Sequence, residues 1–299
     1  MAEISGVLLI DKPCGMTSHD VVNIVRRLYN TKRVGHTGTL DPMATGLLVV
    51  LVGRAAKAAE YLSADSKSYI AGIRLGITTD TEDTTGNILT ECDSIPCESR
   101  VREALDSFRG NIKQIPPMYS ALKVNGQKLV DLARKNVTVE REARDITVDR
   151  LECERVTDNE YILTVDCSKG TYIRTLCADI GATLGCGAAM SSLRRERAGG
   201  YTVCDAHTLE ELDGFEQSER EKMLIPIESL FAELEVVRLP QFYERLARNG
   251  AEIYQKKIKT SLSVGTRVRM YGENGFFALG EVMDYPDGSA VKSIKIFDL

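Results

Sequence analysis

Several features are scarce in this chain of 299 residues, and each absence excludes a class of protein. No apolar run approaches the ~20 residues that a helix needs to cross a bilayer, so we expect no contact with a membrane. The chain starts without a basic segment before its first apolar stretch and carries an early Asp11, which is not the pattern of a secretory signal. We therefore expect the protein to be cytoplasmic.

Metal-ligating residues are few and scattered. The chain has three histidines and eight cysteines, and no two cysteines form a CxxC pair. Because a structural zinc site needs such residues at short spacing, we expect no metal, and we interpret the cysteines as reduced, small apolar side chains. Neither a GxGxxG nor a Walker A sequence occurs, so the motifs give no sign of a nucleotide cofactor.

Charge is distributed unevenly along the chain. The net charge is −5, which taken alone argues against a nucleic-acid partner. Residues 80–106 hold eight acidic and two basic side chains, and residues 205–235 hold ten and two. The rest has a net charge of +9, and its basic side chains gather at residues 26–33, 123–144, 194–197 and 256–259. Each cluster alone is typical of a solvated surface, but together they permit a basic face toward phosphates.

The pattern of apolar residues predicts an α+β fold. Strands are expected at residues 7–10, 47–52, 69–75, 146–155, 161–165, 189–195 and 200–204. Helices are expected at residues 55–62, 101–108, 129–135 and 172–184, and after a cap at Thr17 or Ser18. The strict alternation of a doubly wound sheet is missing, so we predict a mixed, largely antiparallel central sheet.

The last third of the chain predicts a second, smaller unit. The acidic residues 205–235 are interpreted as a helical connector, which divides a main domain at 1–204 from a unit at 236–299. That unit has a predicted helix at 241–248 and predicted strands at 266–271, 276–283 and 289–296. Its roughly 60 residues suit a compact, β-barrel-like module.

The loop GHTGTLDPMATGLL, residues 35–48, is the most informative stretch. Its glycines at 35, 38 and 46 permit positive φ and close backbone approach, and Pro42 keeps Asp41 out of a helix. A carboxylate on such a loop, next to a buried strand, is well placed to meet a ligand. The same carboxylate also suits a turn cap, and spacing alone favours the cap.

Four more residues are candidates with two interpretations each. Tyr172 and Arg174 lie two apart in CSKGTYIRT, where both can face a cavity at the start of a helix. From the residues alone, Tyr69 and Tyr172 also suit core packing with a hydroxyl partner, and Arg174 suits a surface ion pair. A lone histidine such as His36 is typically structural.

Taken together, these segments closely resemble the TruB family of bacterial tRNA pseudouridine synthases. LLIDKPCGMTSHDVV precedes the loop, and matching segments follow in order: KSYIAGIRLGITTDTEDTTG, QIPPMYSALKVNGQKLVDLAR, REARDI, CSKGTYIRTLCADIGATLG and LRRERAGGYTV. The resemblance covers roughly residues 5–204, and several independent motifs in register make chance a poor explanation. The unit at 236–299 loosely resembles the PUA-type RNA-binding module.

The resemblance implies a pseudouridine synthase fold and an isomerase that acts on uridine 55 in the T arm of tRNA without a cofactor. It implies that Asp41 is the catalytic aspartate and that Arg174 pairs with its carboxylate. The carboxylate then attacks C1′, removes a ribose proton or stabilises positive charge, and the sequence does not choose among these routes. The length suits a form that needs neither a guide RNA nor an obligate protein partner.

The resemblance also implies which residues hold the target base. Tyr69 stacks on it, and stacking contributes roughly 1–3 kcal/mol per base. Tyr172 and Leu193 line the base pocket, with Leu193 shielding the uracil. His36 helps to hold the T loop with the base out of its stack.

Two other functions are weighed against this one. An RNA-binding protein of the same fold would act as a tRNA folding aid without chemistry, but the presence of Asp41, Tyr69 and Arg174 argues against lost chemistry. A metal-dependent hydrolase would use Asp80, Glu82 and Asp83 as ligands. Their spacing is not that of a calcium loop, so a solvated acidic turn is favoured.

Overall fold

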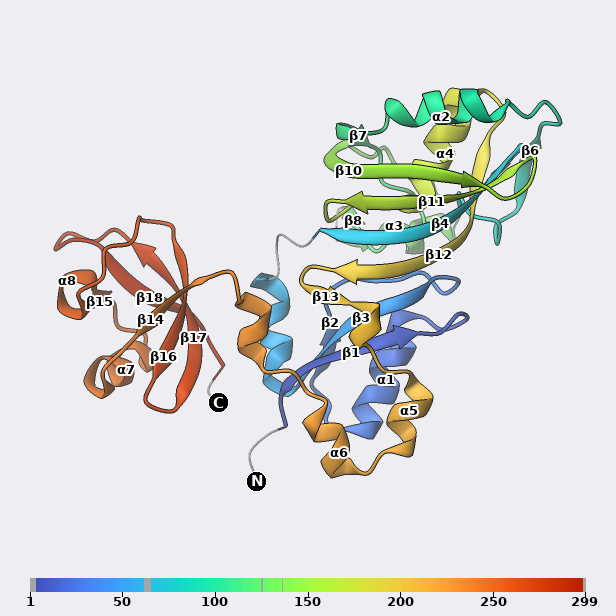
Figure 1. The fold of residues 1–299 in the computed structure, drawn as a ribbon. Coiled ribbons are helices and arrows are strands. Elements are labelled where there is room, and N and C mark those ends of the chain that lie inside the picture. The colour runs from blue at the N-terminus through green and yellow to red at the C-terminus, as the bar shows by residue number, and fades with distance from the viewer. Residues whose placement is uncertain (1–3, 62–65, 125, 136, 298–299) are drawn as a thin grey trace.

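The computed structural model describes residues 4–61, 66–124, 126–135 and 137–297, and Figure 1 shows a larger and a smaller β-sheet with short helices between them. Within these ranges, no helix has the length and apolar character needed to cross a membrane. The larger sheet carries the residues of the predicted site, and the smaller sheet belongs to the C-terminal part of the chain.

The larger sheet has nine strands, in the order β1-β3-β12-β4-β11-β10-β7, with β2 paired to β3 and β13 to β12. The strands are β1 (Gly6–Lys12), β2 (Val34–His36), β3 (Thr45–Val52), β4 (Lys67–Leu75), β7 (Gly110–Gln114), β10 (Arg144–Arg155), β11 (Glu160–Cys167), β12 (Ala188–Ala198) and β13 (Tyr201–Thr202). Only β3 and β12 pair in parallel among these neighbours. The predicted mixed, largely antiparallel sheet is therefore confirmed.

Helices cover the two halves of this sheet. The helix α1 (Ser18–Leu28) begins at Thr17, whose side chain accepts a hydrogen bond from the N–H of Asp20, and its apolar stripe packs against β1 and β3. The helices α2 (Glu98–Asp106) and α4 (Ile173–Leu184) pack on β4, β10 and β11. The short helix α3 (Leu129–Ala133) follows a two-stranded ribbon of β8 (Lys123–Val124) and β9 (Gln127–Lys128).

Three predictions in this domain are wrong in detail. The segment predicted as strands at 189–195 and 200–204 is one long central strand, β12, followed by the two-residue β13 and a 3-10 turn at Val203–Asp205. Pairing to β3 and β4 on both sides overrides the polar residues that obscure β12 in the sequence. The predicted helix at 55–62 is the 3-10 helix η1 (Gly53–Tyr61), and Leu62 lies outside the described residues. The predicted acidic turn is present between two strands that were not predicted, β5 (Ile77–Thr79) and β6 (Ile88–Glu91), but Asp83 within it is buried rather than solvated.

The acidic stretch holds α5 (Leu209–Gly214), α6 (Gln217–Lys222) and the 3-10 helix η3 (Ile227–Phe231). The sheet beyond it has the order β14-β16-β17-β18-β15, and the helix predicted at 241–248 is confirmed as α7. Three of its strands lie within one residue of their predicted bounds, whereas β14, β15 and α8 were not predicted. The bounds are β14 (Glu235–Arg238), α7 (Gln241–Arg248), β15 (Ile253–Tyr254), α8 (Gln255–Ile258), β16 (Arg267–Gly272), β17 (Gly275–Met283) and β18 (Ala290–Ile296).

The C-terminal sheet packs against the main domain through η1 and η3, as Figure 1 shows. Phe231 of η3 contacts Phe276 and Phe297 of the C-terminal part, with ring centroids 6.3 and 5.9 Å apart. Lys57 Nζ and the Tyr61 hydroxyl of η1 donate to carbonyls of β18 at 3.3 and 3.2 Å. A shared apolar cluster therefore fixes the smaller sheet to the larger one.

Candidate active site

Asp41 lies on the loop between β2 and β3, and its carboxylate meets Arg174 from the first turn of α4. Asp41 Oδ2 lies 2.9 Å from Arg174 Nε, and Asp41 Oδ1 lies 3.3 Å from Arg174 Nη2, which makes the pair bidentate. The Arg174 side chain is 6% exposed and the Asp41 side chain is 34% exposed. The structure therefore brings these two residues together, and Arg174 is not the surface ion pair that its local sequence favours.

The guanidinium of Arg174 is held on several sides. Nη1 donates to the carbonyl oxygen of Thr81 at 3.0 Å, and Nη2 donates to that of Tyr119 at 2.8 Å. The buried carboxylate of Asp83 lies 3.9 Å from Nε. Because these partners fix the plane of the guanidinium, its edge presents a constant geometry to Asp41.

Hydrogen bonds hold the backbone on either side of Asp41. Ser18 Oγ accepts from the N–H of Leu40 at 2.8 Å and donates to its carbonyl at 3.1 Å. The carbonyl of Pro42 accepts from the N–H of Gly15 at 2.8 Å and from Lys12 Nζ at 3.4 Å. These hydrogen bonds therefore fix the position of the loop backbone next to Asp41.

Lys12 is a buried cation beneath the loop that sequence reasoning missed. Its residue is 0% exposed, and Nζ also donates to the carbonyls of Pro13 and Met16 at 2.9 and 2.6 Å. Burial lowers the pKa of its ammonium group, and the charge of Asp41 acts in the opposite direction. The sequence feature that could have revealed this buried lysine is its position at the end of an apolar strand, directly before Pro13.

Arg195 is a second buried cation that sequence reasoning assigned elsewhere. Its residue is 1% exposed, Nε donates to the carbonyl of Leu47 at 2.7 Å, and Nη2 donates to that of Gly38 at 3.0 Å. Arg195 also lies opposite Gly46, whose φ is +97° and where a Cβ would approach the Arg195 carbonyl to 2.4 Å. Of the three loop glycines, only Gly46 has the positive φ that the sequence suggested.

Much of the basic cluster at 194–197 is engaged by protein partners, although the side chains of Arg194 and Arg197 stay 39% and 36% exposed. Arg194 pairs with Asp11 at 2.9 Å, and Arg197 donates to the hydroxyls of Ser66 and Ser68 at 3.0 and 3.1 Å. Together with the burial of Arg195, these contacts leave less positive charge free at this surface than the charge distribution suggested.

The predicted base-pocket residues lie on β4, on β12 and at the start of α4. Tyr69 is buried on β4, directly opposite Arg195 of β12, and Leu193 of β12 belongs to the same apolar cluster. Tyr172 is the N-cap residue of α4. Burial raises the pKa of both tyrosine hydroxyls, and the charge of Asp41 acts in the same direction on each. The three side chains give the site two phenols and an aliphatic wall.

His36 ends β2 next to these residues. Burial lowers the pKa of its imidazole, and the charges of Arg195 and His19 lower it further. Its Nδ1 is buried without a hydrogen-bond partner. The neutral imidazole is therefore favoured at this position, with one of its nitrogens buried and unsatisfied.

The three acidic residues considered as metal ligands have protein partners instead. Asp80 accepts from the N–H and side-chain amide of Asn87 at 2.8 and 2.9 Å, and Glu82 accepts from Thr175 Oγ1 at 2.5 Å. Asp83 accepts from Thr81 and Thr85 hydroxyls at 2.9 and 2.5 Å. In the described ranges, no group of three or more His, Cys, Asp or Glu residues could hold a metal ion.

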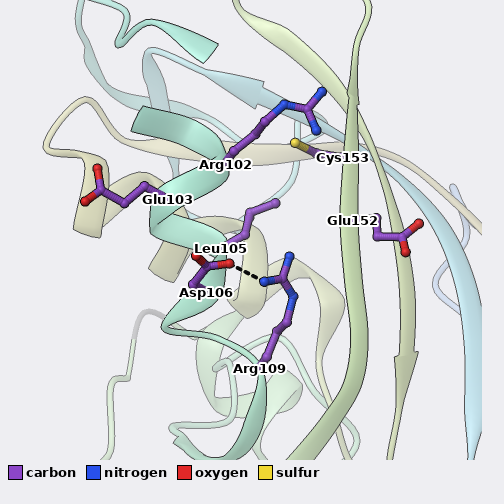
Figure 2. A pocket seen from close by; sticks show the side chains of 7 residues that line it. All are labelled: Arg102, Glu103, Leu105, Asp106, Arg109, Glu152 and Cys153. Carbon is purple, nitrogen blue, oxygen red and sulfur yellow. Dashed lines mark hydrogen bonds and ion pairs between the residues drawn. The ribbon is translucent and has the colours of Figure 1, made fainter. Parts of the chain in front are cut away.

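Two surface hollows lie elsewhere. One, of about 290 Å³, is lined from α2 and β10 and is shown in Figure 2, where Arg109 pairs with Asp106. The other, of about 420 Å³, is lined by residues of β9 and α3 and their surroundings. Neither contains a residue of the predicted site.

Comparison with known proteins identifies the family of the chain. The N-terminal domain of TruB family pseudouridylate synthases matches residues 26–173, and the C-terminal domain of tRNA pseudouridylate synthase B matches residues 174–232. The tRNA pseudouridine synthase B of Alkaliphilus oremlandii is 42% identical over 298 residues, covering 99% of this chain and 98% of that protein. That of Clostridium tetani is 39% identical over 279 residues, covering 93% and 96%.

Solved structures share the fold. A chain of a Cbf5-Nop10-Gar1 complex is 28% identical with a TM-score of 0.73, and the alignment covers 98% of this chain and 84% of that one. A chain of an H/ACA RNP bound to a substrate RNA containing 2′-deoxyuridine is 25% identical with a TM-score of 0.72, covering 98% and 85%. The predicted pseudouridine synthase fold is thereby confirmed, and the chain belongs to the TruB family of pseudouridylate synthases.

Proposed function

We propose that this enzyme converts uridine 55 in the T arm of tRNA to pseudouridine, with Asp41 as its catalytic carboxylate and without a cofactor. The observation that carries the proposal is the bidentate pair of the partly exposed Asp41 with the buried Arg174. The relatives named tRNA pseudouridine synthase B support tRNA as the substrate class.

The reaction needs little beyond a carboxylate and a shaped pocket. The N-glycosidic bond between N1 and C1′ breaks, the uracil turns within the site, and a bond from its C5 to C1′ forms. C5 then loses its proton and N1 carries one, so the atoms balance and no electrons are gained or lost overall. Asp41 can serve by attacking C1′, by removing a ribose proton to give a glycal, or by stabilising developing positive charge. In each case Arg174 aims the carboxylate, because it holds both oxygens at once.

The surrounding side chains suit an extruded base. An enzyme that acts on a base takes it out of the stack and holds it between aromatic and apolar walls. We assign stacking to Tyr69, the remaining pocket walls to Tyr172 and Leu193, and contact with the T loop to His36. His36 ends β2, directly before the loop that carries Asp41, which supports an assignment at the edge of the site.

We also propose that the chain acts alone in the cytoplasm, without a guide RNA or an obligate protein partner. Its close relatives over nearly the whole length carry the name of a tRNA enzyme. The division that fits this activity is a catalytic domain at 1–204, a connector at 205–235 and a PUA-like RNA-binding module at 236–299. The exposed Lys256, Lys257 and Lys259 on and after α8 support RNA contact by that module.

The test is incubation of the purified chain, without other macromolecules, with an unmodified T-arm stem–loop, followed by mapping of pseudouridine at nucleotide resolution. Product at position 55 alone is expected, and a chelator should leave the rate unchanged. RNA binding without product would instead favour a folding aid, and product that appears only after a guide RNA is added would contradict independent action.

A further inference from the structure

Gln114 connects the edge of the sheet to the start of the helix that carries Arg174. It ends β7, its residue is 2% exposed, and its side chain meets the backbone of Tyr172. Nε2 donates to the Tyr172 carbonyl at 3.1 Å, and Oε1 accepts from the Tyr172 N–H at 2.8 Å. A carboxamide offers a donor and an acceptor side by side, so one side chain satisfies both backbone groups of a single residue.

The start of α4 needs such a partner. Its N-cap residue is Tyr172, whose side chain makes no capping hydrogen bond, although the first turns of helices leave their N–H groups without internal partners. The Tyr172 carbonyl accepts the first helical bond from Leu176 at 3.0 Å. The backbone orientation at this point is therefore set from outside the helix, by Gln114.

The same segment reaches the helix a second time. The two prolines that follow Gln114 stiffen the chain, and Arg141 Nη1 donates to the carbonyl of Pro116 at 3.0 Å. Three residues later, the carbonyl of Tyr119 accepts from Arg174 Nη2 at 2.8 Å. The segment from Gln114 to Tyr119 thus braces the start of α4 at its backbone and at its arginine.

We propose that Gln114 is a positioning residue for the isomerisation: its carboxamide fixes the Tyr172 backbone, and so places Tyr172 and Arg174 against Asp41. Gln114 itself lies outside contact with the reacting atoms and acts through the helix start. The test of this inference by enzyme activity rests on the proposed function. A second test, by hydrogen exchange of backbone amides, needs no substrate.

The sharpest variant is Gln114→Glu, which keeps the shape and changes the chemistry. The introduced carboxylate still accepts from the Tyr172 N–H but repels the Tyr172 carbonyl, and protonation restores the lost donor. At about pH 8 we expect the single-turnover rate to fall roughly tenfold to a hundredfold relative to the unaltered chain, the scale expected for a small misplacement of reacting groups. The ratio of the two rates should recover as the pH falls, while RNA affinity stays within about threefold.

Two further variants separate positioning from general damage. Gln114→Met fills similar space without hydrogen bonds, so it should lose rate by a similar factor at every pH. Gln217→Glu makes the same chemical change at an exposed site on α6 and should leave the rate and its pH dependence unchanged. All rates are taken at a temperature at which circular dichroism shows each variant to be folded.

Hydrogen exchange provides the measurement that needs no substrate. In Gln114→Met, amides at the start of α4 should exchange faster because the Tyr172 N–H has lost its acceptor, while amides near Leu184 should not change. Unchanged exchange there, or a rate loss in Gln114→Glu that matches its loss of RNA affinity and persists at low pH, would overturn the proposal. If the unaltered chain makes no product on the T-arm RNA, the proposed function fails, and exchange alone decides the role of Gln114.

Discussion

The two walls that meet at Asp41 are built in different ways. The loop that carries the carboxylate is held at several separate points, by Ser18, Lys12, the backbone of Gly15 and Arg195. Across the site, the start of α4 depends on Gln114 and on the contacts of Arg174 itself. The loop of the carboxylate is thus held by anchors on its backbone, whereas Arg174 is held through its own guanidinium and through the start of α4.

Because of this difference, substitutions on the two walls should have different effects on stability and on rate. A change to one anchor of the loop leaves other anchors in place, so its cost should appear mainly in stability. A change on the opposite wall alters the side chain that holds both carboxylate oxygens, so its cost should appear in rate as well. The predictions below test that separation, beginning with the group on which both walls converge.

The largest effect is expected for Asp41→Asn. The amide keeps the shape of the side chain but removes its charge and its nucleophile or base, so product formation should be abolished. RNA affinity should stay within about tenfold, or roughly 1.4 kcal/mol, because most binding comes from phosphate and shape contacts elsewhere. Single-turnover assays and filter binding measure the two quantities, with Asp158→Asn at a 97% exposed side chain as the matched control. Clear turnover, or affinity lost in step with activity, would return Asp41 to the role of a turn cap.

Arg174→Ala should come next. It should lose much of the rate but not all, and the double variant with Asp41→Asn should be no worse than Asp41→Asn, because residues that act as a unit are not additive. It should also lower the free energy of unfolding by about 3 kcal/mol, since the buried carboxylate of Asp83 loses its cation. Arg100→Ala, at an exposed site on α2, is the control for both measurements. A double variant clearly worse than Asp41→Asn would separate the two residues.

The two walls also differ in how much of them could be predicted from the sequence. Motif resemblance is enough to name Asp41 and Arg174, because they lie in distinctive stretches of loop and helix start. It is not enough for Arg195 or Lys12, because a cation in a basic or terminal stretch is ordinarily solvated, and only the pairing of β12 with β3 and β4 shows that Arg195 is buried. The role of Gln114 is hidden for the same reason, since it depends on a contact 58 residues away.

A smaller effect is expected from the C-terminal module, which lies apart from both walls. Substituting Lys256, Lys257 and Lys259 with glutamine should weaken binding of full-length tRNA and leave binding of an isolated T-arm hairpin unchanged. Each lost phosphate contact should lower the slope of log affinity against log salt by about 0.7–0.9. Substitution is preferable to deletion of the module, because deletion would expose Phe231 and the apolar cluster around it. Equal losses on both RNAs would contradict RNA contact specific to this module.

Ser18→Ala tests the anchored wall directly. It removes two hydrogen bonds to Leu40 in a residue that is 2% exposed, so the free energy of unfolding should fall by about 1–3 kcal/mol, the cost of unsatisfied buried groups. The rate at a temperature at which the variant is folded should change only a few-fold, because the remaining anchors still hold the loop. Urea unfolding and single-turnover assays check the two effects, with Ser218→Ala on α6 as the exposed control. A loss of rate as large as that of Arg174→Ala would show that the loop is not held redundantly.

The smallest effect is expected in the pH dependence of stability at His36, on the anchored side. Burial, followed by the charges of Arg195 and His19, lowers the pKa of its imidazole in the folded state. As the pH falls through about 6.5, the unfolded chain therefore takes up a proton that the folded chain does not, and the free energy of unfolding decreases. This contribution to stability is complete above the unfolded pKa and is lost as the pH falls toward the folded one. His36→Gln has no such proton to exchange, so its free energy of unfolding, measured in urea between about pH 7.5 and pH 5.5, should decrease less than that of the unaltered chain. If the free energy of unfolding decreased equally in the unaltered chain and in His36→Gln, the imidazole would take up its proton as readily in the folded state as in the unfolded one. Neither burial nor the charge of Arg195 would then oppose protonation of His36.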